Sequence, residues 1–317
     1  MKFSLTNEFK DRLREEILNY NIDFIQKSFE GVSYVDITEL LYEFDSNDSK
    51  YILDNIDFDI SAKIISELDE DNRKNFLKIF SAEEVAKFLN VIDSDDGADI
   101  LSELDVEFRG DVISQIEDSE KSKNLKELLR YDEDVAGGLM AIELVKCNIN
   151  WKINQCIDLI KKQAENVSNI YSVYVTDNKG KLLGKVSLKD ILLAKDNSRI
   201  KDVYDDYVIS VDAKMNQEEV SQIMQKYDLT VLPVVNKRGK LLGRITIDDV
   251  VDVITETAEE ERQIMSGITS DVEEDDSIWK LSNARLPWLI IGILGGLFGA
   301  FFLGSFENKY FRDNQVF

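Results

Sequence analysis

The sequence contains no histidine and only two cysteines and two prolines among its 317 residues. Without an imidazole, the chain has no histidine for acid–base catalysis, for a Ser-His-Asp triad or for a zinc site. Cys147 and Cys156 form no metal-binding motif, so we expect two small buried thiols in a reducing compartment. A nucleophile–base pair and a cofactor-binding loop are missing as well, and the sequence therefore predicts a protein that is not an enzyme.

Positive charge is also scarce, because 38 basic residues stand against 62 acidic ones and leave a net charge of −24. A chain of this charge will not hold nucleic acid by neutralising phosphates, but it will attract divalent cations. Carboxylate oxygens are hard ligands that suit Mg²⁺ or Ca²⁺, whereas soft metals prefer thiolate or imidazole. The composition therefore favours oxygen-ligated divalent cations as ligands.

Charge of either sign is missing from residues 286–306, between Arg285 and Glu307. About 20 apolar residues cross a bilayer, and Trp288 stands near one edge, where an interfacial aromatic residue belongs. The alternative is a buried helix of a soluble protein, in which each glycine would cost about 1 kcal/mol. In a membrane, glycines at GxxxG spacing form a flat face for a neighbouring helix: Gly292, Gly295, Gly296 and Gly299. We therefore expect a transmembrane helix here, and no N-terminal signal peptide because residues 1–20 are charged throughout.

The first 130 residues lack proline, contain glycine at three positions only, and show helical apolar spacing. They contain a weak repeat with an offset of 36 residues: 62–69 is echoed by 98–105, and Arg73 by Arg109. Stacked helix pairs of about this length form short superhelices, in which each pair buries a face that it cannot bury alone. A helical domain without repeats is the alternative. We predict an all-α superhelical domain, followed by a linker around a pair of adjacent glycines.

A block of 59 residues then occurs twice, since the run from Gly180 to Asp190 returns from Gly239 to Asp249. In each copy an amphipathic helix and an apolar strand come before this run: 151–163 and 171–176 in the first, 217–226 and 231–235 in the second. Gly180 and Gly239 end hairpin turns that require a positive φ. Each copy therefore reads as strand, helix, strand, glycine turn, strand and helix, which predicts a tandem pair of α/β units.

The second copy continues into an acidic segment, in which residues 248–276 include twelve acidic residues and one basic residue. Five carboxylates fall on one face of the predicted helix: Asp249, Asp252, Glu256, Glu259 and Glu260. Like charges at this spacing destabilise a helix by roughly a few tenths of a kcal/mol per pair. The face is therefore either solvated or neutralised by cations. The helical domain contains a second carboxylate cluster that could face the first: Asp95, Asp96 and Asp99.

The last helix of each block is expected to begin at Ser187 or Thr246, with Asp190 or Asp249 three residues later. This spacing is a variant of the capping box, so both aspartates have a structural role as an alternative to any binding role.

Three parts of the sequence resemble a known family, the MgtE-type magnesium transporters. The runs DLTVLPVV at 228–235 and GKLLGRITIDDVVDV at 239–253 resemble the second CBS domain of that family. The run YDEDVAGGLM at 131–140 resembles the junction between its helical N domain and its CBS pair. RLPWL at 285–289 and GSFE at 304–307 resemble the two ends of its first transmembrane helix.

The resemblance extends over about residues 55–307 and implies a multidomain chain. Its expected parts follow in order: an all-α superhelical N domain at 1–130 with a divergent first 50 residues, an α/β tandem CBS pair at 137–197 and 198–255, a long acidic connecting "plug" helix at 248–283, one transmembrane helix at 285–307 and a short tail at 308–317.

By this resemblance, the chain belongs to a homodimeric Mg²⁺ channel in which Mg²⁺ bound between N domain, CBS pair and plug favours the closed state. The implied ligand positions are Asp95, Asp99, Gly138, Glu218, Asp228, Asp249, Asp252, Glu260 and Glu261. Three further ligand positions of the family hold Lys63, Asn216 and Thr257 here. Because lysine cannot bind a cation, at least one site is expected to be rearranged, with Glu256 or Glu259 compensating on the plug.

CBS pairs also bind adenine nucleotides, and the resemblance makes ATP a second expected ligand beside Mg²⁺. Ser187 and Asp190 fit the Ser/Thr-x-x-Asp pattern whose carboxylate holds the ribose, with capping as an equal alternative for Asp190. Asp249 has three candidate roles, as a cap, a ribose contact and a Mg²⁺ ligand. We favour the Mg²⁺ ligand because Asp252 and Glu256 extend the same helix face.

The resemblance also sets expectations for location and partners. Residues 1–284 are expected in the cytoplasm, with the chain anchored in the cell membrane and paired as a homodimer through its CBS domains. The family's pore has five transmembrane helices, so this chain is not expected to conduct ions without the missing ones. The apolar helix residues expected at the dimer contact are Ile157, Ile160, Val220, Ile223 and Met224.

Two other functions stay open at this point. One is a CBS-type adenine-nucleotide sensor attached to another membrane protein. The other is a helical interaction scaffold, because the N domain also resembles helical modules of the bacterial flagellar switch. The acidic helix followed by a membrane span favours the Mg²⁺-sensing function over both.

Overall fold

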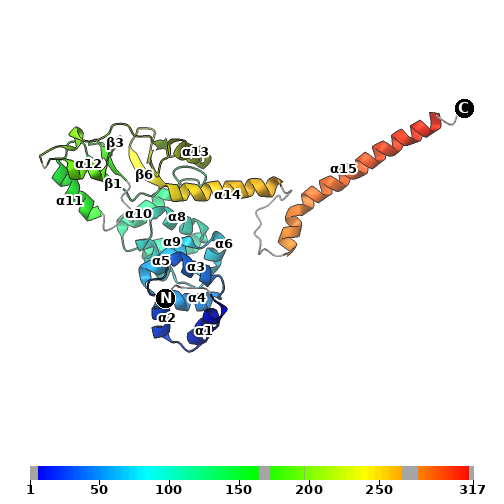
Figure 1. The fold of residues 1–317 in the computed structure, drawn as a ribbon, viewed down its shortest axis with the longest axis horizontal. Coiled ribbons are helices and arrows are strands. Elements are labelled where there is room, and N and C mark those ends of the chain that lie inside the picture. The colour runs from blue at the N-terminus through cyan, green and yellow to red at the C-terminus, as the bar shows by residue number, and fades with distance from the viewer. Residues whose placement is uncertain (1–5, 164–171, 196, 266–277, 314–317) are drawn as a thin grey trace. The chain divides into compact units, whose positions relative to one another are not determined.

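The computed structural model describes residues 6–163, 172–195, 197–265 and 278–313 (Figure 1). By its internal contacts the chain divides into two compact units, residues 1–250 and residues 251–317. The first unit contains the helical domain and both α/β blocks, as the sequence predicts.

The helical domain consists of ten short helices joined by tight turns (Figure 1). They are α1 (Asn7–Leu18), α2 (Ile22–Phe29), α3 (Tyr34–Leu41), α4 (Ser46–Asn55), α5 (Phe58–Glu67), α6 (Glu70–Leu77), α7 (Ala82–Val91), α8 (Ser94–Glu103), α9 (Val106–Gln115) and α10 (Ser119–Leu128). Helices two apart in sequence pack on each other, such as α3 on α5 and α7 on α9. This stacking is that of a superhelix.

The helices from α2 to α9 begin at intervals of 12 residues. A polar residue precedes each of them: Asn21, Ser33, Asp45, Asp57, Asp69, Ser81, Asp93 and Asp105. The 36-residue repeat therefore spans three helices, and the expectation of one helix pair per repeat is wrong. A helix of 8–10 residues needs only a capping residue and a short turn to complete 12 residues, which explains the interval.

The repeated arginines donate equivalent hydrogen bonds in both copies. Arg73 donates to the carbonyls of Ser66 (2.7 Å) and Leu68 (3.0 Å) at the end of α5. Arg109 donates to the carbonyls of Ser102 (2.6 Å) and Leu104 (3.0 Å) at the end of α8. Each guanidinium satisfies carbonyls that a helix C-terminus leaves without partners, so the repeat seen in the sequence is a repeat of structure.

Both α/β blocks have the predicted order of elements. The first contains β1 (Val145–Asn148), α11 (Ile153–Gln163), β2 (Val173–Thr176), β3 (Leu182–Val186) and α12 (Leu188–Leu193); the second contains β4 (Val211–Asp212), α13 (Gln217–Tyr227), β5 (Val231–Val235), β6 (Leu241–Thr246) and α14 (Ile247–Met265). In each block the first two strands pair in parallel and the last two pair antiparallel. A short 3₁₀ turn, Ile200–Asp202, joins the blocks.

The two glycine turns have the predicted backbone conformation and lie against each other. Gly180 has a φ of +78° and Gly239 a φ of +74°, where a side chain would be strained. The Leu182 N–H donates to the Gly239 carbonyl (2.9 Å), and the Leu241 N–H donates to the Gly180 carbonyl (3.0 Å). These reciprocal bonds join the two blocks through equivalent positions of the repeat.

The helical domain and the second block share one hydrophobic core, whereas the first block has its own. This packing overturns part of the expected dimer contact. Val220 and Met224 are 0% exposed within the chain's own core, and Ile157, Ile160 and Ile223 are partly buried. Val220 and Met224 are therefore covered inside one chain, whereas Ile157, Ile160 and Ile223 keep part of their surface accessible.

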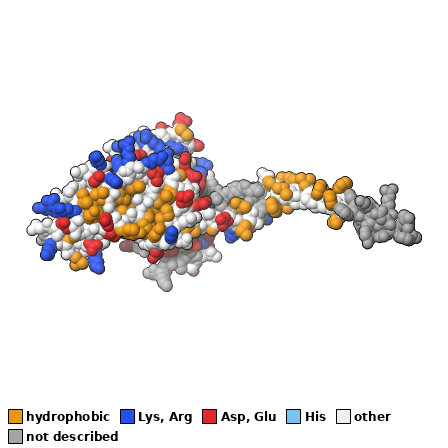
Figure 2. Space-filling view, turned by 90° about the horizontal axis from the view of Figure 1, so that it is seen from above, with side chains coloured by type: hydrophobic (Ala, Val, Ile, Leu, Met, Phe, Trp, Pro, Cys, Tyr) orange, Lys and Arg blue, Asp and Glu red, His pale blue; other side chains and the backbone are white. Residues whose placement is uncertain are grey.

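The second unit contains the rest of α14 and the helix α15 (Ile278–Asp313). Residues 282–304 of α15 have a mean hydropathy of 2.1, and this stretch is long and apolar enough to cross a membrane. Figure 2 shows hydrophobic side chains along this helix. The predicted plug helix is described up to Met265, and residues 266–277 lie outside the described part of the chain.

Candidate metal site

An acidic cluster forms where the helical domain meets the second block, and consists of Asp95, Asp96 and Asp99 on α8 and Asp249 on α14. Asp95 and Asp96 stand in the first turn of α8 and Asp249 in the first turn of α14. The charge of Asp249 raises the pKa of both Asp95 and Asp96, which shows that side chains from the two domains lie close together. Asp249, one of the five carboxylates of the predicted acidic face, therefore lies near the carboxylates of α8.

All four carboxyls of the cluster have pKa values above the ordinary range. Partial removal from water is the largest cause in each case, followed by neighbouring carboxylates for the three residues of α8. The pKa of Asp99 rises to about 7 and those of Asp96 and Asp249 to about 6. The pKa of Asp95 is raised well above its usual value. Keeping these groups ionised at neutral pH therefore costs free energy that a bound cation would offset.

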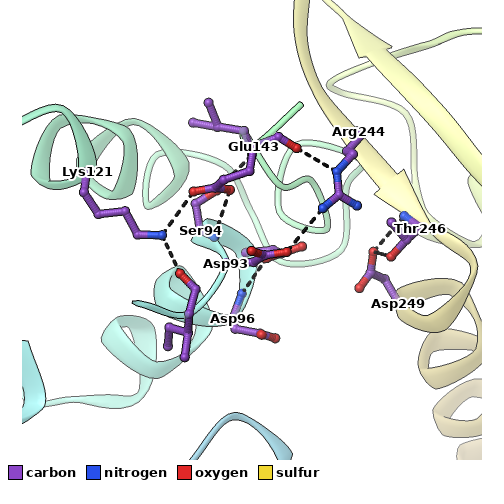
Figure 3. A network of polar contacts seen from close by, with 11 residues as sticks. Asp93, Ser94, Asp96, Lys121, Glu143, Arg244, Thr246 and Asp249 are labelled. Atoms are coloured by element: carbon purple, nitrogen blue, oxygen red, sulfur yellow. Dashed lines mark hydrogen bonds and ion pairs between the residues drawn. The ribbon is translucent and has the colours of Figure 1, made fainter. Parts of the chain in front are cut away.

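Asp249 is both a cap and a member of the cluster. Its Oδ2 accepts hydrogen bonds from the Thr246 N–H (2.8 Å) and the Thr246 hydroxyl (2.7 Å), as the predicted capping spacing requires (Figure 3). These two bonds use one carboxylate oxygen. The capping and metal-binding roles are therefore compatible in one side chain.

Asp99 and Gly138 meet the same segment of the linker. Glu133 is among the charges that raise the pKa of Asp99. A Cβ placed on Gly138 would lie 2.6 Å from the Asp132 carbonyl and 3.0 Å from Glu133, so no larger residue fits there. Gly138 thus keeps this turn tight, and Glu133 is an acidic neighbour of the cluster that the sequence did not single out.

Glu218 and Asp228 stand apart at opposite ends of α13. Both are exposed, and the 11 residues of this helix separate its ends by about 15 Å. The N-terminus of α13 is tied to the linker by a bond from the Gln217 N–H to the Asp134 carbonyl (2.9 Å). Asp228 ends the helix in the left-handed conformation, with a φ of 52°. The two carboxylates therefore cannot bind the same ion.

The remaining predicted ligands lie on α14 in the second unit. Asp252 and Glu261 are exposed, and for Glu256, Glu259 and Glu260 the structure describes the backbone only. All five are helical, as is Asp249, so the residues predicted to share a carboxylate face lie on one helix: Asp249, Asp252, Glu256, Glu259 and Glu260.

The three departures from the family's ligand positions have structural partners. The Lys63 ammonium lies 5.7 Å from the centre of the Tyr34 ring. Asn216 caps α13 by accepting from the Glu218 N–H (2.8 Å), and the Thr257 hydroxyl donates to the Val253 carbonyl (2.8 Å).

Among the described residues, no three side chains of Asp, Glu, Cys or His lie where they could hold a metal ion together. Mg²⁺ usually keeps several waters and takes one or two carboxylates. The donor set of the acidic cluster, which consists of carboxylates only, fits a hydrated Mg²⁺ held by such a pair.

The predicted nucleotide residues form a local cap. The Ser187 hydroxyl donates to Oδ2 of Asp190 (2.5 Å) and accepts from the Asp190 N–H (3.0 Å), and both residues are exposed. A cavity of about 150 Å³ lies elsewhere, between the blocks. Its lining residues are Ser172, Tyr174, Lys185, Val208, Ile209, Asp228, Leu229, Thr230, Val231 and Pro233.

A network of ion pairs borders the acidic cluster and was not foreseen from the sequence (Figure 3). Arg244 of β6 donates from Nε to the Glu143 carbonyl (2.7 Å) and from Nη2 to Oδ2 of Asp93 (3.2 Å). Lys121 of α10 donates to Oε1 of Glu143 (3.1 Å), and Ser94 of α8 donates to Oε2 of the same carboxylate. The network joins the helical domain, the linker and the second block.

Comparison with known proteins matches the chain to two domain families in sequence order. Residues 32–134 match the MgtE intracellular N domain, and residues 134–197 and 200–256 match the CBS domain. Solved structures include the cytosolic domain of the Mg²⁺ channel MgtE in complex with ATP. It is 29% identical, has a TM-score of 0.72, and the match covers 77% of this chain and 99% of that one. The chain is of the MgtE type.

Curated MgtE relatives agree with this assignment. The magnesium transporter MgtE of Enterococcus faecalis is 35% identical over 191 residues, and that of Thermus thermophilus is 35% identical over 193 residues. Each match covers 60% of this chain, but only 42% and 43% of the two relatives. The MgtE-type chain thus spans less than half the length of these curated relatives.

Proposed function

We propose that this chain senses cytosolic Mg²⁺ for an MgtE-type Mg²⁺ transporter and is not an enzyme. In this function, residues 1–284 lie in the cytoplasm and α15 anchors the chain in the cell membrane. Mg²⁺ held by the acidic cluster favours the arrangement in which the N domain is docked on the second CBS domain, and this arrangement favours the closed pore. The observation that carries the proposal is the meeting of Asp95 and Asp96 of the N domain with Asp249 of the second CBS domain, whose charge raises the pKa of both aspartates.

The cluster's own chemistry supports this assignment. Asp95 and Asp249 would each supply one carboxylate oxygen to a hydrated ion, while Asp96 and Asp99 would lower the local potential. When Mg²⁺ leaves, the negative charges repel across the domain boundary. Asp252, Glu256, Glu259, Glu260 and Glu261 remain predicted Mg²⁺ ligands, as do Gly138, Glu218 and Asp228.

The homodimer also remains a proposal, with Mg²⁺, the lipid bilayer and the further transmembrane helices of the pore as the other partners. Because Val220 and Met224 of α13 are buried within one chain, the contact proposed here uses a more exposed surface. Leu192 and Leu193 of α12 are 77% and 74% exposed, and this helix is the better candidate for a contact between CBS domains.

Replacing Asp95 by Asn tests the Mg²⁺ site. The variant keeps the shape of the side chain and the hydrogen bond from the Asp96 N–H (3.0 Å), but removes one charge. We expect Mg²⁺ affinity to fall by about tenfold or more, because one ligand oxygen loses its charge. The protein without Mg²⁺ should become more stable, because repulsion within the cluster decreases. Calorimetric titration with MgCl₂ and thermal melts in EDTA measure the two effects.

The control is Asp45→Asn at the N-cap of α4, where the side chain caps its own helix. It removes the same charge far from the cluster and should leave Mg²⁺ affinity unchanged. Equal Mg²⁺ affinity in Asp95→Asn and the parent would exclude Asp95 from the site.

A nucleotide-sensing function is the second candidate, and the cavity between the blocks favours it. The Tyr174 hydroxyl is buried at this cavity without a hydrogen-bond partner among the described residues. Burial also raises the pKa of Tyr174, so the group stays a neutral donor. Lys185 adds a positive charge to the lining. At about 150 Å³ the cavity is smaller than typical ligand pockets of about 300–1,000 Å³, so it would enclose only part of a nucleotide.

Tyr174→Phe is expected to weaken ATP binding several-fold, because it removes a donor that a ligand would use. It should not destabilise the ligand-free protein, since the hydroxyl has no partner to lose. Calorimetric titration with ATP and thermal melts measure both quantities. The control Ser187→Ala tests the nucleotide site that the sequence predicts at Ser187 and Asp190. A loss of ATP affinity in Ser187→Ala but not in Tyr174→Phe would favour that site over the cavity.

A further inference from the structure

The residue before α8, like those before α3 and α9, makes no capping hydrogen bond, whereas the residues before the other helices of the 12-residue series do. Before α4, α5 and α6 an aspartate accepts hydrogen bonds from its own helix: Asp45, Asp57 and Asp69. Asp93 occupies the equivalent position before α8 but makes no such bond. Its carboxylate accepts instead from Arg244, which lies 151 residues away in sequence. The residue before α8 is thus used for a contact between domains.

Glu143 of the linker takes over the capping of α8. Its Oε2 accepts from the Ser94 N–H (3.1 Å) and from the Ser94 hydroxyl (2.6 Å). The Ser94 Oγ in turn accepts from the Ile142 N–H (2.8 Å). The first turn of α8 is therefore held by the segment that leads into the CBS pair, and a helix N-terminus favours this carboxylate.

Two buried cations balance the two carboxylates. Lys121 donates to the Ile92 carbonyl and to Glu143, and the side chains of Lys121 and Glu143 are 10% and 16% exposed. Arg244 is 7% exposed, and its backbone also pairs with that of Ala141 in both directions (2.8 and 2.9 Å). Lys121 and the Ser94 hydroxyl outweigh burial and lower the pKa of Glu143 below its ordinary value. The set of Asp93, Glu143, Lys121 and Arg244 is thus charge-balanced, unlike the acidic cluster beside it.

We propose that Asp93, Glu143, Lys121 and Arg244 form a metal-independent clasp that holds α8 against the second CBS domain in the docked arrangement. Arg244 acts as a tethered cation at the edge of the acidic cluster, and Glu143 holds the turn that carries Asp95 and Asp96. The clasp opposes the repulsion between Asp249 and the aspartates of α8, and so it lowers the free energy that Mg²⁺ must supply to keep the two domains docked. The role of these four as positioning residues for Mg²⁺ rests on the proposed function, whereas their role as a clasp does not.

Hydrogen exchange in the full chain, purified in detergent with EDTA, tests the clasp. The peptides to follow cover the start of α8 and residues 139–144, with α4 as an internal reference. In Arg244→Gln we expect exchange in the first two segments to accelerate by about tenfold or more, because the partly buried carboxylate of Asp93 loses its ion pair. Exchange in α4 should not change. Arg244→Lys, which keeps the charge, should restore most of the protection.

Arg238→Gln is the matched control, since Arg238 is an exposed cation in the turn before the same strand. It should behave as the parent does. If Arg244→Gln exchanges like the parent in EDTA, the clasp does not hold α8 and the proposal is wrong. If exchange in α4 is also faster in Arg244→Gln, the helical domain has unfolded. In that case Asp93→Asn replaces Arg244→Gln as the test variant. Acceleration confined to α8 and residues 139–144 then supports the clasp, and its absence overturns it.

Adding MgCl₂ separates the clasp from the Mg²⁺ function. If both hold, Mg²⁺ restores protection in Arg244→Gln, with a midpoint several-fold higher than the midpoint for its effect on the parent. If Mg²⁺ changes exchange in neither protein while the difference in EDTA persists, the clasp stands and the Mg²⁺-sensing function fails.

Discussion

Millimolar Mg²⁺ is expected to raise the melting temperature of the full chain by roughly 5–10 °C over the value in EDTA. Mg²⁺ binds only the folded arrangement, because the acidic cluster joins residues far apart in sequence, Asp95 and Asp249. At a concentration 100-fold above Kd, one such site adds about 2.7 kcal/mol to the free energy of unfolding. For a folded unit of about 250 residues, each kcal/mol corresponds to about 2–4 °C. Thermal melts followed by fluorescence in detergent measure the shift.

Potassium chloride at matched ionic strength is the control, because simple screening also weakens repulsion between carboxylates. Limited proteolysis of the linker should slow in parallel with the melting shift. Equal melting temperatures in EDTA, MgCl₂ and matched KCl, together with equal proteolysis, would remove the support for a Mg²⁺ sensor.

The tandem blocks were predictable from the sequence because their signals are local. A glycine turn needs Gly180 or Gly239 at a position of positive φ, and the strands beside it alternate or run apolar over a few residues. The capping pairs Ser187 with Asp190 and Thr246 with Asp249 are three residues apart, so their geometry follows from spacing alone. Each of these features depends on residues within about ten positions of one another.

The sequence predicts the all-α fold of the helical domain but not the length of its structural repeat. The match between 62–69 and 98–105 indicates a unit of 36 residues. The 12-residue interval is visible only in the capping positions. These positions hold Asn, Ser or Asp, and the residues between them show no further similarity. Asn, Ser and Asp cap helices about equally well, so equivalent positions of the 12-residue period hold different residue types. The period therefore gives little sequence similarity between the units.

The clasp could not be predicted from the sequence. Its hydrogen bonds join residues far apart in the chain, and its four residues form no recognisable motif. Arg244 meets the Glu143 carbonyl across 101 positions and Asp93 across 151. From the sequence alone, Asp93 would be assigned as a capping residue, like the polar residues that precede the other helices at 12-residue intervals. The acidic cluster was foreseen as two separate groups of carboxylates, since each group is local, and its assembly follows from the domain contact that the clasp makes.

The pH dependence of the Mg²⁺ effect follows from the raised pKa values of the cluster. The pKa values of Asp96 and Asp249 are about 6 and that of Asp99 about 7, compared with about 3.9 in the unfolded chain. The folded protein therefore binds more protons than the unfolded one between about pH 4 and pH 7. The stability that these protons provide is complete below about pH 4 and is lost as the pH rises through 6 and 7. In EDTA, the cluster thus opposes folding most strongly above pH 7.

Mg²⁺ and protons compete for the same carboxylate oxygens, so the shift in melting temperature caused by Mg²⁺ should grow between pH 5.5 and pH 8. Other titrating groups affect the curves in EDTA and in MgCl₂ alike, and the difference between the curves isolates the cluster. We expect this difference to be small at pH 5.5, to increase most between pH 6 and 7, and to level off by pH 8. In Asp95→Asn the increase should be reduced, because fewer protons are displaced. A difference that is the same at pH 5.5 and pH 8 would show that Mg²⁺ binds carboxylates whose pKa values are ordinary, and would place its site outside the acidic cluster.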